Sequence, residues 1–200
     1  MTAPVVGSGD IHRSYTGVGR PPILTAVKPL QAVAMGLVIV LLGVTVAGYD
    51  LLADPIGWLL VLVGLATLPA PGRGALQALA TLSLLVSAVV WFPAAREALN
   101  VTDLALAWAA GLPELVTLVL LAHRLARVAG DAGDQPARTW LQTARTLLIV
   151  VALLPAVVLG GGFETLDAAL GIVGSLVLLL LIVVLFRYTG RPWAQPASDS

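Results

Sequence analysis

This chain contains six apolar runs, and its basic residues cluster at every second break between them and at the two ends. Of the eleven Lys and Arg residues, ten lie before the first run, in the second break, in or beside the fourth break, or after the last run. These ten are Arg13, Arg20, Lys28, Arg73, Arg124, Arg127, Arg138, Arg145, Arg187 and Arg191, and only Arg96 lies elsewhere. Short loops rich in Lys and Arg stay in the cytoplasm, because their translocation is unfavourable. The pattern therefore predicts an all-α polytopic transmembrane bundle of six spans in a bacterial inner (plasma) membrane, with both termini cytoplasmic.

The composition agrees with a membrane protein and argues against several other classes. Charged residues make up 11% of the chain and the mean hydropathy is +0.97, whereas soluble domains contain about 25% charged residues. The net charge is zero, so no basic surface suggests nucleic acid as a partner. The chain has no cysteine, and its two histidines, His12 and His123, lack metal-ligand spacing. No hydrolase, nucleotide-binding or zinc motif occurs, so we expect neither enzyme activity nor a cofactor or bound metal.

The six runs have roughly the length that crosses a bilayer, about 20 helical residues. We place them at Leu30–Gly48, Pro55–Leu68, Ala75–Phe92, Leu104–Ala122, Leu141–Gly160 and Leu166–Phe186. They form a membrane domain over residues 29–187, between cytoplasmic tails at residues 1–28 and 188–200.

Two of these runs admit an alternative. Leu30–Gly48 follows basic residues as a signal-peptide core does, but it is longer than the usual core of roughly 7–15 residues. Pro55–Leu68 is short, so it is either a complete span in a locally thinned bilayer or a re-entrant segment, which would leave five spans. The charge pattern favours a complete crossing, because re-entry would put the later arginines on the side opposite the N-terminal basic residues.

Glu114 is the strongest candidate for a functional residue, because it lies near the middle of the fourth span. A charge at that depth costs about 3 kcal/mol, so we expect the side chain to be buried in the bundle, protonated or paired. Pro113 removes a backbone hydrogen bond and is expected to break the helix, and Thr117 is placed to hydrogen-bond near Glu114. Broken helices that carry an acid bind ions, protons or substrates in transporters; alternatively, Glu114 only stabilises packing. We also expect Pro155 to open a cavity beside the fourth span.

Acidic residues occupy the breaks that lack Lys and Arg. They are Asp50, Asp54, Glu97, Asp103, Glu164 and Asp167. Together they could form an outer acidic face that concentrates cations or binds Ca²⁺. The favoured interpretation is simpler: Asp54, Asp103 and Asp167 precede spans and cap their helices.

The inner loop and the aromatic residues have membrane roles in this scheme. We expect Arg124, Arg127, Arg138 and Arg145 to contact anionic lipid headgroups. Trp58, Trp91 and Trp108 lie near predicted outer edges, where tryptophan anchors a helix at the headgroup level.

One segment carries a resemblance to other proteins. The stretch YDLLADPIGWLLVLVGL, from Tyr49 to Leu65, resembles a segment of uncharacterised bacterial multi-pass membrane proteins in which a DPIGW-type sequence starts a short apolar helix. It covers less than a tenth of the chain and implies no known activity. The resemblance adds Asp54, Gly57 and Trp58 to the residues of interest.

These features predict a multi-pass integral membrane protein that acts as a small transport or permeation unit, with Glu114 binding a proton or cation. The alternative is a non-catalytic accessory subunit of a cell-envelope membrane complex, docked through its outer loops or its arginine-rich loop. The expected partners are the lipid bilayer and either another envelope membrane protein or a second copy of the chain, with no nucleic acid.

Overall fold

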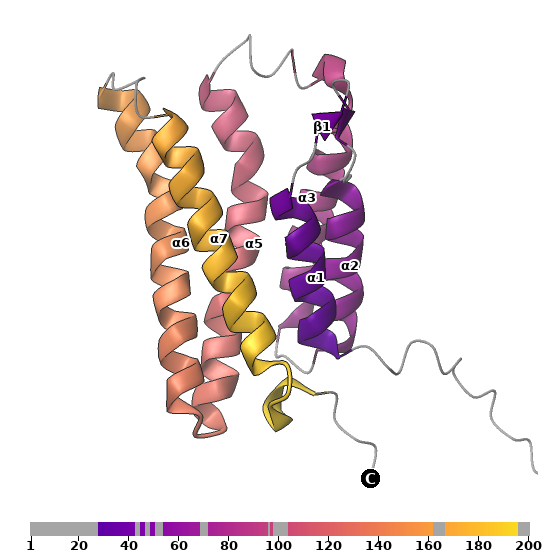
Figure 1. The fold of residues 1–200 in the computed structure, drawn as a ribbon, viewed down its shortest axis with the longest axis vertical. Helices are drawn as coiled ribbons and strands as arrows, with labels where there is room; N and C mark the ends of the chain where they lie inside the picture. The colour runs from indigo at the N-terminus through magenta and orange to yellow at the C-terminus, as the bar shows by residue number, and fades with distance from the viewer. Residues whose placement is uncertain are drawn as a thin grey trace, which may run out of the picture.

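The computed structural model describes residues 28–42, 45–46, 49–50, 54–68, 72–95, 97, 104–161 and 167–195. The principal helices are α1 (Pro29–Leu42), α2 (Asp54–Thr67), α3 (Arg73–Val90), α5 (Leu104–Asp131), α6 (Gln135–Gly161) and α7 (Asp167–Tyr188), with a 3₁₀-helix η2 (Pro192–Ala194) after them (Figure 1). Between α1 and α2, the two-residue strands β1 (Thr45–Val46) and β2 (Tyr49–Asp50) pair antiparallel, with Thr45 opposite Asp50. Apart from this short pairing the described chain is helical, which confirms the all-α prediction.

The helices stand side by side and alternate in direction (Figure 1). The principal contacts join each helix to the next one along the chain, and α7 packs back against α1. These contacts close a ring of three antiparallel hairpins, formed by α1 with α2, α3 with α5, and α6 with α7. As a result, α1, α3 and α6 begin at the same end of the ring at which α2, α5 and α7 finish.

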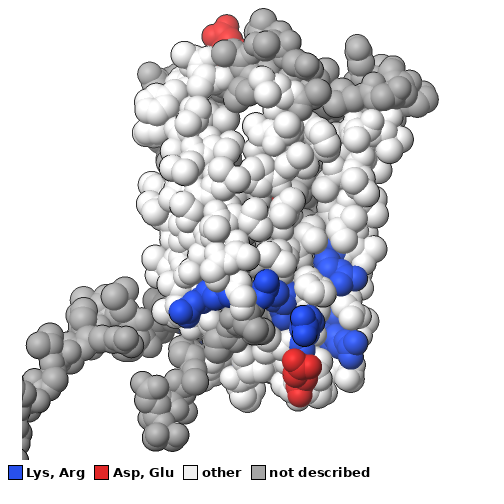
Figure 2. Space-filling view, turned by 180° about the vertical axis from the view of Figure 1, so that it is seen from behind, with Lys and Arg blue, Asp and Glu red and all other residues white. Residues whose placement is uncertain are grey.

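The described basic residues gather at that end, which we call the basic end (Figure 2). They are Lys28, Arg73, Arg124, Arg127, Arg138, Arg145, Arg187 and Arg191. We call the opposite end, where α7 begins at Asp167, the acidic end. The alternation of basic residues along the sequence therefore becomes a concentration of Lys and Arg at one end of the folded bundle, where Asp131 and Asp134 also lie. Arg13, Arg20 and Arg96 lie outside the described residues.

Four helices, α3, α5, α6 and α7, are long and apolar enough to cross a membrane. A membrane location therefore agrees with the folded chain as well as with its hydropathy. The helices α1 and α2 are also apolar, but each has only 14 residues, or about 21 Å at 1.5 Å per residue.

Several predicted boundaries were wrong. The span expected at Leu30–Gly48 ends as a helix at Leu42, because Thr45 and Val46, both β-branched, pair in the β1–β2 ladder instead. In contrast, α5 continues past Ala122 to Asp131, and α6 begins before Leu141, at Gln135. The fourth break is therefore a tight turn with Gly133 at a φ of 76°, a left-handed conformation that glycine adopts without strain.

The predicted span Pro55–Leu68 agrees with α2 to within one residue at each end. Its backbone runs antiparallel to α1 and ends at the basic end, with Gly57 against Gly36 and Gly64 against Pro29. With only 14 residues, α2 covers a smaller part of the bundle's height than the four longer helices do.

The tightly packed core occupies the basic half of the ring. In α1, α3 and α6, which start at the basic end, the buried side chains stop at Leu37, Ser83 and Leu148. In α5 and α7, which run the other way, they begin at Thr117 and Val177. Beyond this level the described side chains of these five helices are partly or fully exposed, so the acidic half of the bundle is more loosely packed.

Two aromatic residues expected at the membrane edge have roles inside the protein. Trp58 is only 1% exposed and belongs to the core between the helices, so the anchoring prediction for it was wrong. The indole N–H of Trp108, in α5, donates a hydrogen bond of 3.1 Å to the carbonyl of Ala152 in α6. This bond ties α5 to α6 in the loosely packed half.

Candidate functional site

Glu114 lies on the inside of the ring, near half height. It follows Leu104, the first residue of α5, by ten positions and precedes Arg124 by ten. At 1.5 Å per residue, each separation is about 15 Å. The side chain is partly buried. Among the described residues, none donates a hydrogen bond to its carboxylate or forms an ion pair with it.

The helix around Glu114 is continuous, so the expected break at Pro113 was wrong. Helix α5 runs from Leu104 to Asp131 with Pro113 inside it. The hydroxyl of Thr117 donates a 2.6 Å hydrogen bond to the carbonyl of Pro113, in the local side-chain-to-backbone pattern that helices tolerate with a slight bend. Packing of α5 against both α3 and α6 holds the helix together across the proline.

A cavity of about 360 Å³ adjoins Glu114, and we call it the Glu114 cavity. Residues of α1, α2, α5, α6 and α7 line it, so most of the ring converges there. Its polar side chains are Glu114, Asp54 from the first turn of α2, and Ser175 from α7, whereas the other lining residues are apolar or glycine. Two carboxylates that are 60 positions apart in the sequence therefore share one cavity within an apolar bundle.

On the side facing the basic end, the Glu114 cavity borders the packed core. Leu118 and Leu148 line the cavity and are only 2% and 1% exposed. Thr117, at the same level, is fully buried. The cavity therefore sits at the boundary where close packing of the basic half gives way to the looser acidic half.

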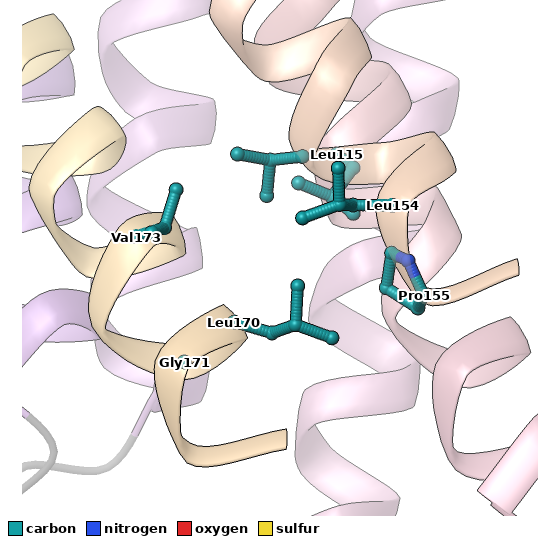
Figure 3. A pocket seen from close by; sticks show the side chains of 7 residues that line it. Leu115, Leu154, Pro155, Leu170, Gly171 and Val173 are labelled. Carbon is teal, nitrogen blue, oxygen red and sulfur yellow. The ribbon is translucent and has the colours of Figure 1, made fainter. Parts of the chain in front are cut away.

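A second cavity of about 210 Å³ lies beside the first, and we call it the apolar chamber (Figure 3). It is lined by residues of α5, α6 and α7, and the side chains around it in Figure 3 include Leu115, Leu154, Pro155 and Leu170. The prediction of a cavity between Pro155 and the fourth span is confirmed. Leu115, Val151 and Gly171 line both spaces, so the apolar chamber and the Glu114 cavity adjoin.

The structure places Thr117 away from the Glu114 cavity. Its hydroxyl oxygen lies 3.3 Å from that of Ser83 in α3, and both side chains are buried. Ser83 also bonds to the carbonyl of Leu79. Thr117 therefore links α5 to α3 instead of hydrogen-bonding to the Glu114 carboxylate as predicted.

Of the predicted outer acidic face, the structure places the side chains of Asp54 and Glu97; Glu97 is exposed, whereas Asp54 has a more specific position. It is the first residue of α2, where a carboxylate faces the positive end of the helix dipole, and it also lines the Glu114 cavity. Asp50 belongs to β2 and Asp167 starts α7, but their side chains lie outside the described part of the chain, as do Asp103 and Glu164. Sequence reasoning assigned Asp54 to capping and missed its position beside Glu114.

The four arginines proposed to contact lipid headgroups divide into two pairs. Arg127 and Arg138 are exposed near the α5–α6 turn. Arg124 and Arg145 are partly buried: the guanidinium of Arg124 covers Gly72, and Arg145 donates to Nδ1 of His123 at 3.0 Å. The second pair therefore contacts protein as well as facing the basic end.

Asp134, which was not singled out in the sequence, organises the basic end. One carboxylate oxygen accepts the backbone N–H of Ala137 at the start of α6. The other accepts the indole N–H of Trp193 at 3.2 Å and lies 3.3 Å from Nε of Arg191. The hydrogen bond from Trp193 is the main reason that the pKa of Asp134 lies below its usual value, with smaller contributions from Ala137 and Arg191. Asp134 could have been identified from the sequence by its position just before a helix, where aspartate commonly caps the helix.

The arrangement as a whole offers an acid-lined cavity joined to an apolar one. Within the described residues, no group of three or more His, Cys, Asp or Glu side chains is placed to hold a metal ion. Two carboxylates and a hydroxyl can bind a proton or a cation through oxygen atoms. Comparison of the chain with protein-family models, curated proteins and solved structures finds no match.

Proposed function

We propose that this protein is a small transport or permeation unit of a bacterial inner membrane, in which Glu114 binds a proton or a cation. The observation that carries the proposal is the presence of Glu114 and Asp54 on one cavity inside the bundle. Two ionised carboxylates in such a space repel each other, and a bound proton or cation relieves that repulsion. Ionisable residues inside membranes usually mark ion or substrate pathways for this reason.

We further propose six crossings with both termini in the cytoplasm. The alternating helices support this topology, because they bring the described basic residues to one end, as short cytoplasmic loops require. The two short helices α1 and α2 would cross by local thinning of the bilayer, which costs only fractions of a kcal/mol per ångström of mismatch. Their tight packing along each other keeps them aligned with the longer helices.

The topology is testable with single cysteines, because the natural chain has none. Leu42→Cys at the end of α1 and Ala94→Cys after α3 should react with a membrane-impermeant maleimide added to intact cells. Ala132→Cys, in the α5–α6 turn, should react only after permeabilisation. Protection of Leu42→Cys together with labelling of Ala94→Cys would show that the α1–α2 hairpin does not cross.

The function is testable by proton and monovalent-cation flux in proteoliposomes. Glu114→Gln should keep the fold and abolish flux, because glutamine retains the size and polarity of the side chain but cannot carry its charge. Glu97→Gln is the matched control, since Glu97 is an exposed acid between α3 and α5 and does not line the Glu114 cavity. Equal flux in wild type and Glu114→Gln would contradict the proposal. Absence of flux in every variant, with copurification of a stoichiometric partner, would favour the accessory-subunit alternative.

A further inference from the structure

The two adjoining cavities have different chemistry. The Glu114 cavity presents the carboxylates of Glu114 and Asp54, whereas every residue that lines the apolar chamber is apolar or glycine. Leu115, Val151 and Gly171 belong to both walls, so the charged and apolar parts form one continuous region on the inside of α5, α6 and α7. A ligand that occupied both parts would need to combine a positive charge with an apolar group that reaches into the chamber.

The glycines of α7 help to keep this region open. A Cβ atom added at Gly171 would meet nothing within 4 Å, and one added at Gly174 would meet only Val151, at 3.7 Å. A side chain would therefore find open space at Gly171 and ordinary contact at Gly174, whereas at the glycines of α1 and α2 it would clash with backbone and valine atoms. A bare proton or a hydrated metal cation gains nothing from an apolar chamber, whereas an organic cation buries its hydrocarbon surface there.

We propose that this region binds a monovalent lipophilic organic cation, with its charge beside Glu114 and an apolar group among Leu154, Leu170 and Val173. The inference rests on the proposed function and names the substrate class for the same site. The carboxylates supply charge selection, and the chamber supplies affinity through burial of apolar surface. Asp54 adds a second negative charge to the cavity wall and strengthens the preference for cations over neutral compounds.

The test uses tetraphenylphosphonium as the probe and the purified full-length chain in detergent micelles. Equilibrium dialysis of the labelled probe should give saturable binding, and Glu114→Gln should weaken it at least tenfold. Triphenylphosphine oxide, a neutral apolar analogue, should compete at least tenfold less well. Equal competition by the neutral compound, or binding unchanged in Glu114→Gln, would show that the region accepts any apolar body, including a lipid chain, and would overturn the proposal.

The apolar chamber is tested separately from the carboxylate. Leu170→Trp places a large ring in the chamber and should weaken binding of tetraphenylphosphonium at least tenfold, while Ile172→Trp, on the exposed side of α7, should leave it unchanged. Gly171→Leu, whose added side chain starts in open space, serves as a second filling variant if Leu170→Trp does not fold. Unchanged affinity in a folded filling variant would also overturn the proposal.

Flux measured on the same preparations separates the two proposals. Glu114-dependent flux of protons or small cations without binding of tetraphenylphosphonium would sustain the proposed function and overturn the substrate class. Binding that depends on both Glu114 and the chamber, without flux of protons, small cations or the probe, would support the organic-cation site and contradict transport.

Discussion

The backbones of Gly36 in α1 and Gly57 in α2 lie directly against each other. A Cβ atom at Gly36 would come within 2.5 Å of the Gly57 carbonyl oxygen, and one at Gly57 would come within 2.7 Å of the Gly36 carbonyl oxygen. Gly64 makes the same kind of approach to the carbonyl of Pro29, at 2.7 Å. Small residues allow such close packing in membranes, where association depends on van der Waals contact. The two shortest of the six principal helices are thus packed with their backbones in direct contact.

Gly36→Ala should therefore destabilise the protein, because the clash is with backbone that cannot rotate away. We expect a loss of about 1–3 kcal/mol, the usual effect of overpacking. Gly74→Ala, in the first turn of α3, is the control, because a Cβ there meets nothing within 4 Å. Reversible unfolding in mixed micelles measures both variants. A stability for Gly36→Ala equal to that of Gly74→Ala would mean that α1 and α2 are not in this contact.

Thr117→Val should lower stability without disturbing the Glu114 cavity. Valine keeps the shape but loses the hydrogen bonds to Pro113 and Ser83. The expected cost is about 1 kcal/mol per lost hydrogen bond. Flux and cation binding of the folded variant should match those of the wild type, because Thr117 faces α3. A loss of cation binding as large as that in Glu114→Gln would instead place Thr117 in the binding site.

Asp54→Asn should reduce cation binding and flux by less than Glu114→Gln does. Asparagine still caps a helix about as well as aspartate, so the start of α2 is preserved while one negative charge leaves the cavity. The comparison is made by measuring flux at increasing cation concentrations in Asp54→Asn and in Glu114→Gln. The double variant should resemble Glu114→Gln alone, since Asp54 acts through the shared cavity. Wild-type cation dependence in Asp54→Asn would limit Asp54 to capping.

Asp134→Asn should release the segment after α7 from the α5–α6 turn. The variant loses the ion pair with Arg191 and weakens the bond to the Trp193 indole. Faster hydrogen exchange in residues 189–195, with unchanged exchange in α6, is the expected result. Asp131→Asn is the control, because Asp131 is exposed and one turn away. Equal protection in Asp134→Asn and wild type would show that the carboxylate does not hold this segment.

The same contact has a predictable pH dependence. Because the folded state lowers the pKa of Asp134 from its ordinary 3.8, the ionised carboxylate contributes stability above that ordinary pKa. This contribution is lost as the pH falls through the lowered value, when the folded protein also takes up the proton. Hydrogen exchange of residues 189–195 should therefore be unaffected between neutral pH and about pH 5. It should rise only in stronger acid, and a rise near neutral pH would contradict the assignment to Asp134.

Helix type, helix order and the polarity of the bundle could all be predicted from the chain. Long apolar runs in a lipid environment must satisfy their backbone hydrogen bonds internally, and a continuous apolar run such as Ala75–Phe92 does so as a helix. The alternation of basic residues such as Arg73 and Arg187 then orients those helices. Glu114 could also be identified from the sequence, because a single acid within an apolar run is energetically costly in a membrane.

The partners of Glu114 required the tertiary structure. Helical periodicity places Thr117 on roughly the same face, but in the packed ring Thr117 lies against Ser83 while Glu114 lines a cavity with Asp54. Likewise, the turn at Asp134 recruits Arg191 and Trp193 from more than 50 positions away. Hydropathy and charge depend on each residue alone and can be summed along the chain. A shared cavity or an ion pair depends on which helix faces are opposed, and that is decided only when α7 packs against α1 and closes the ring.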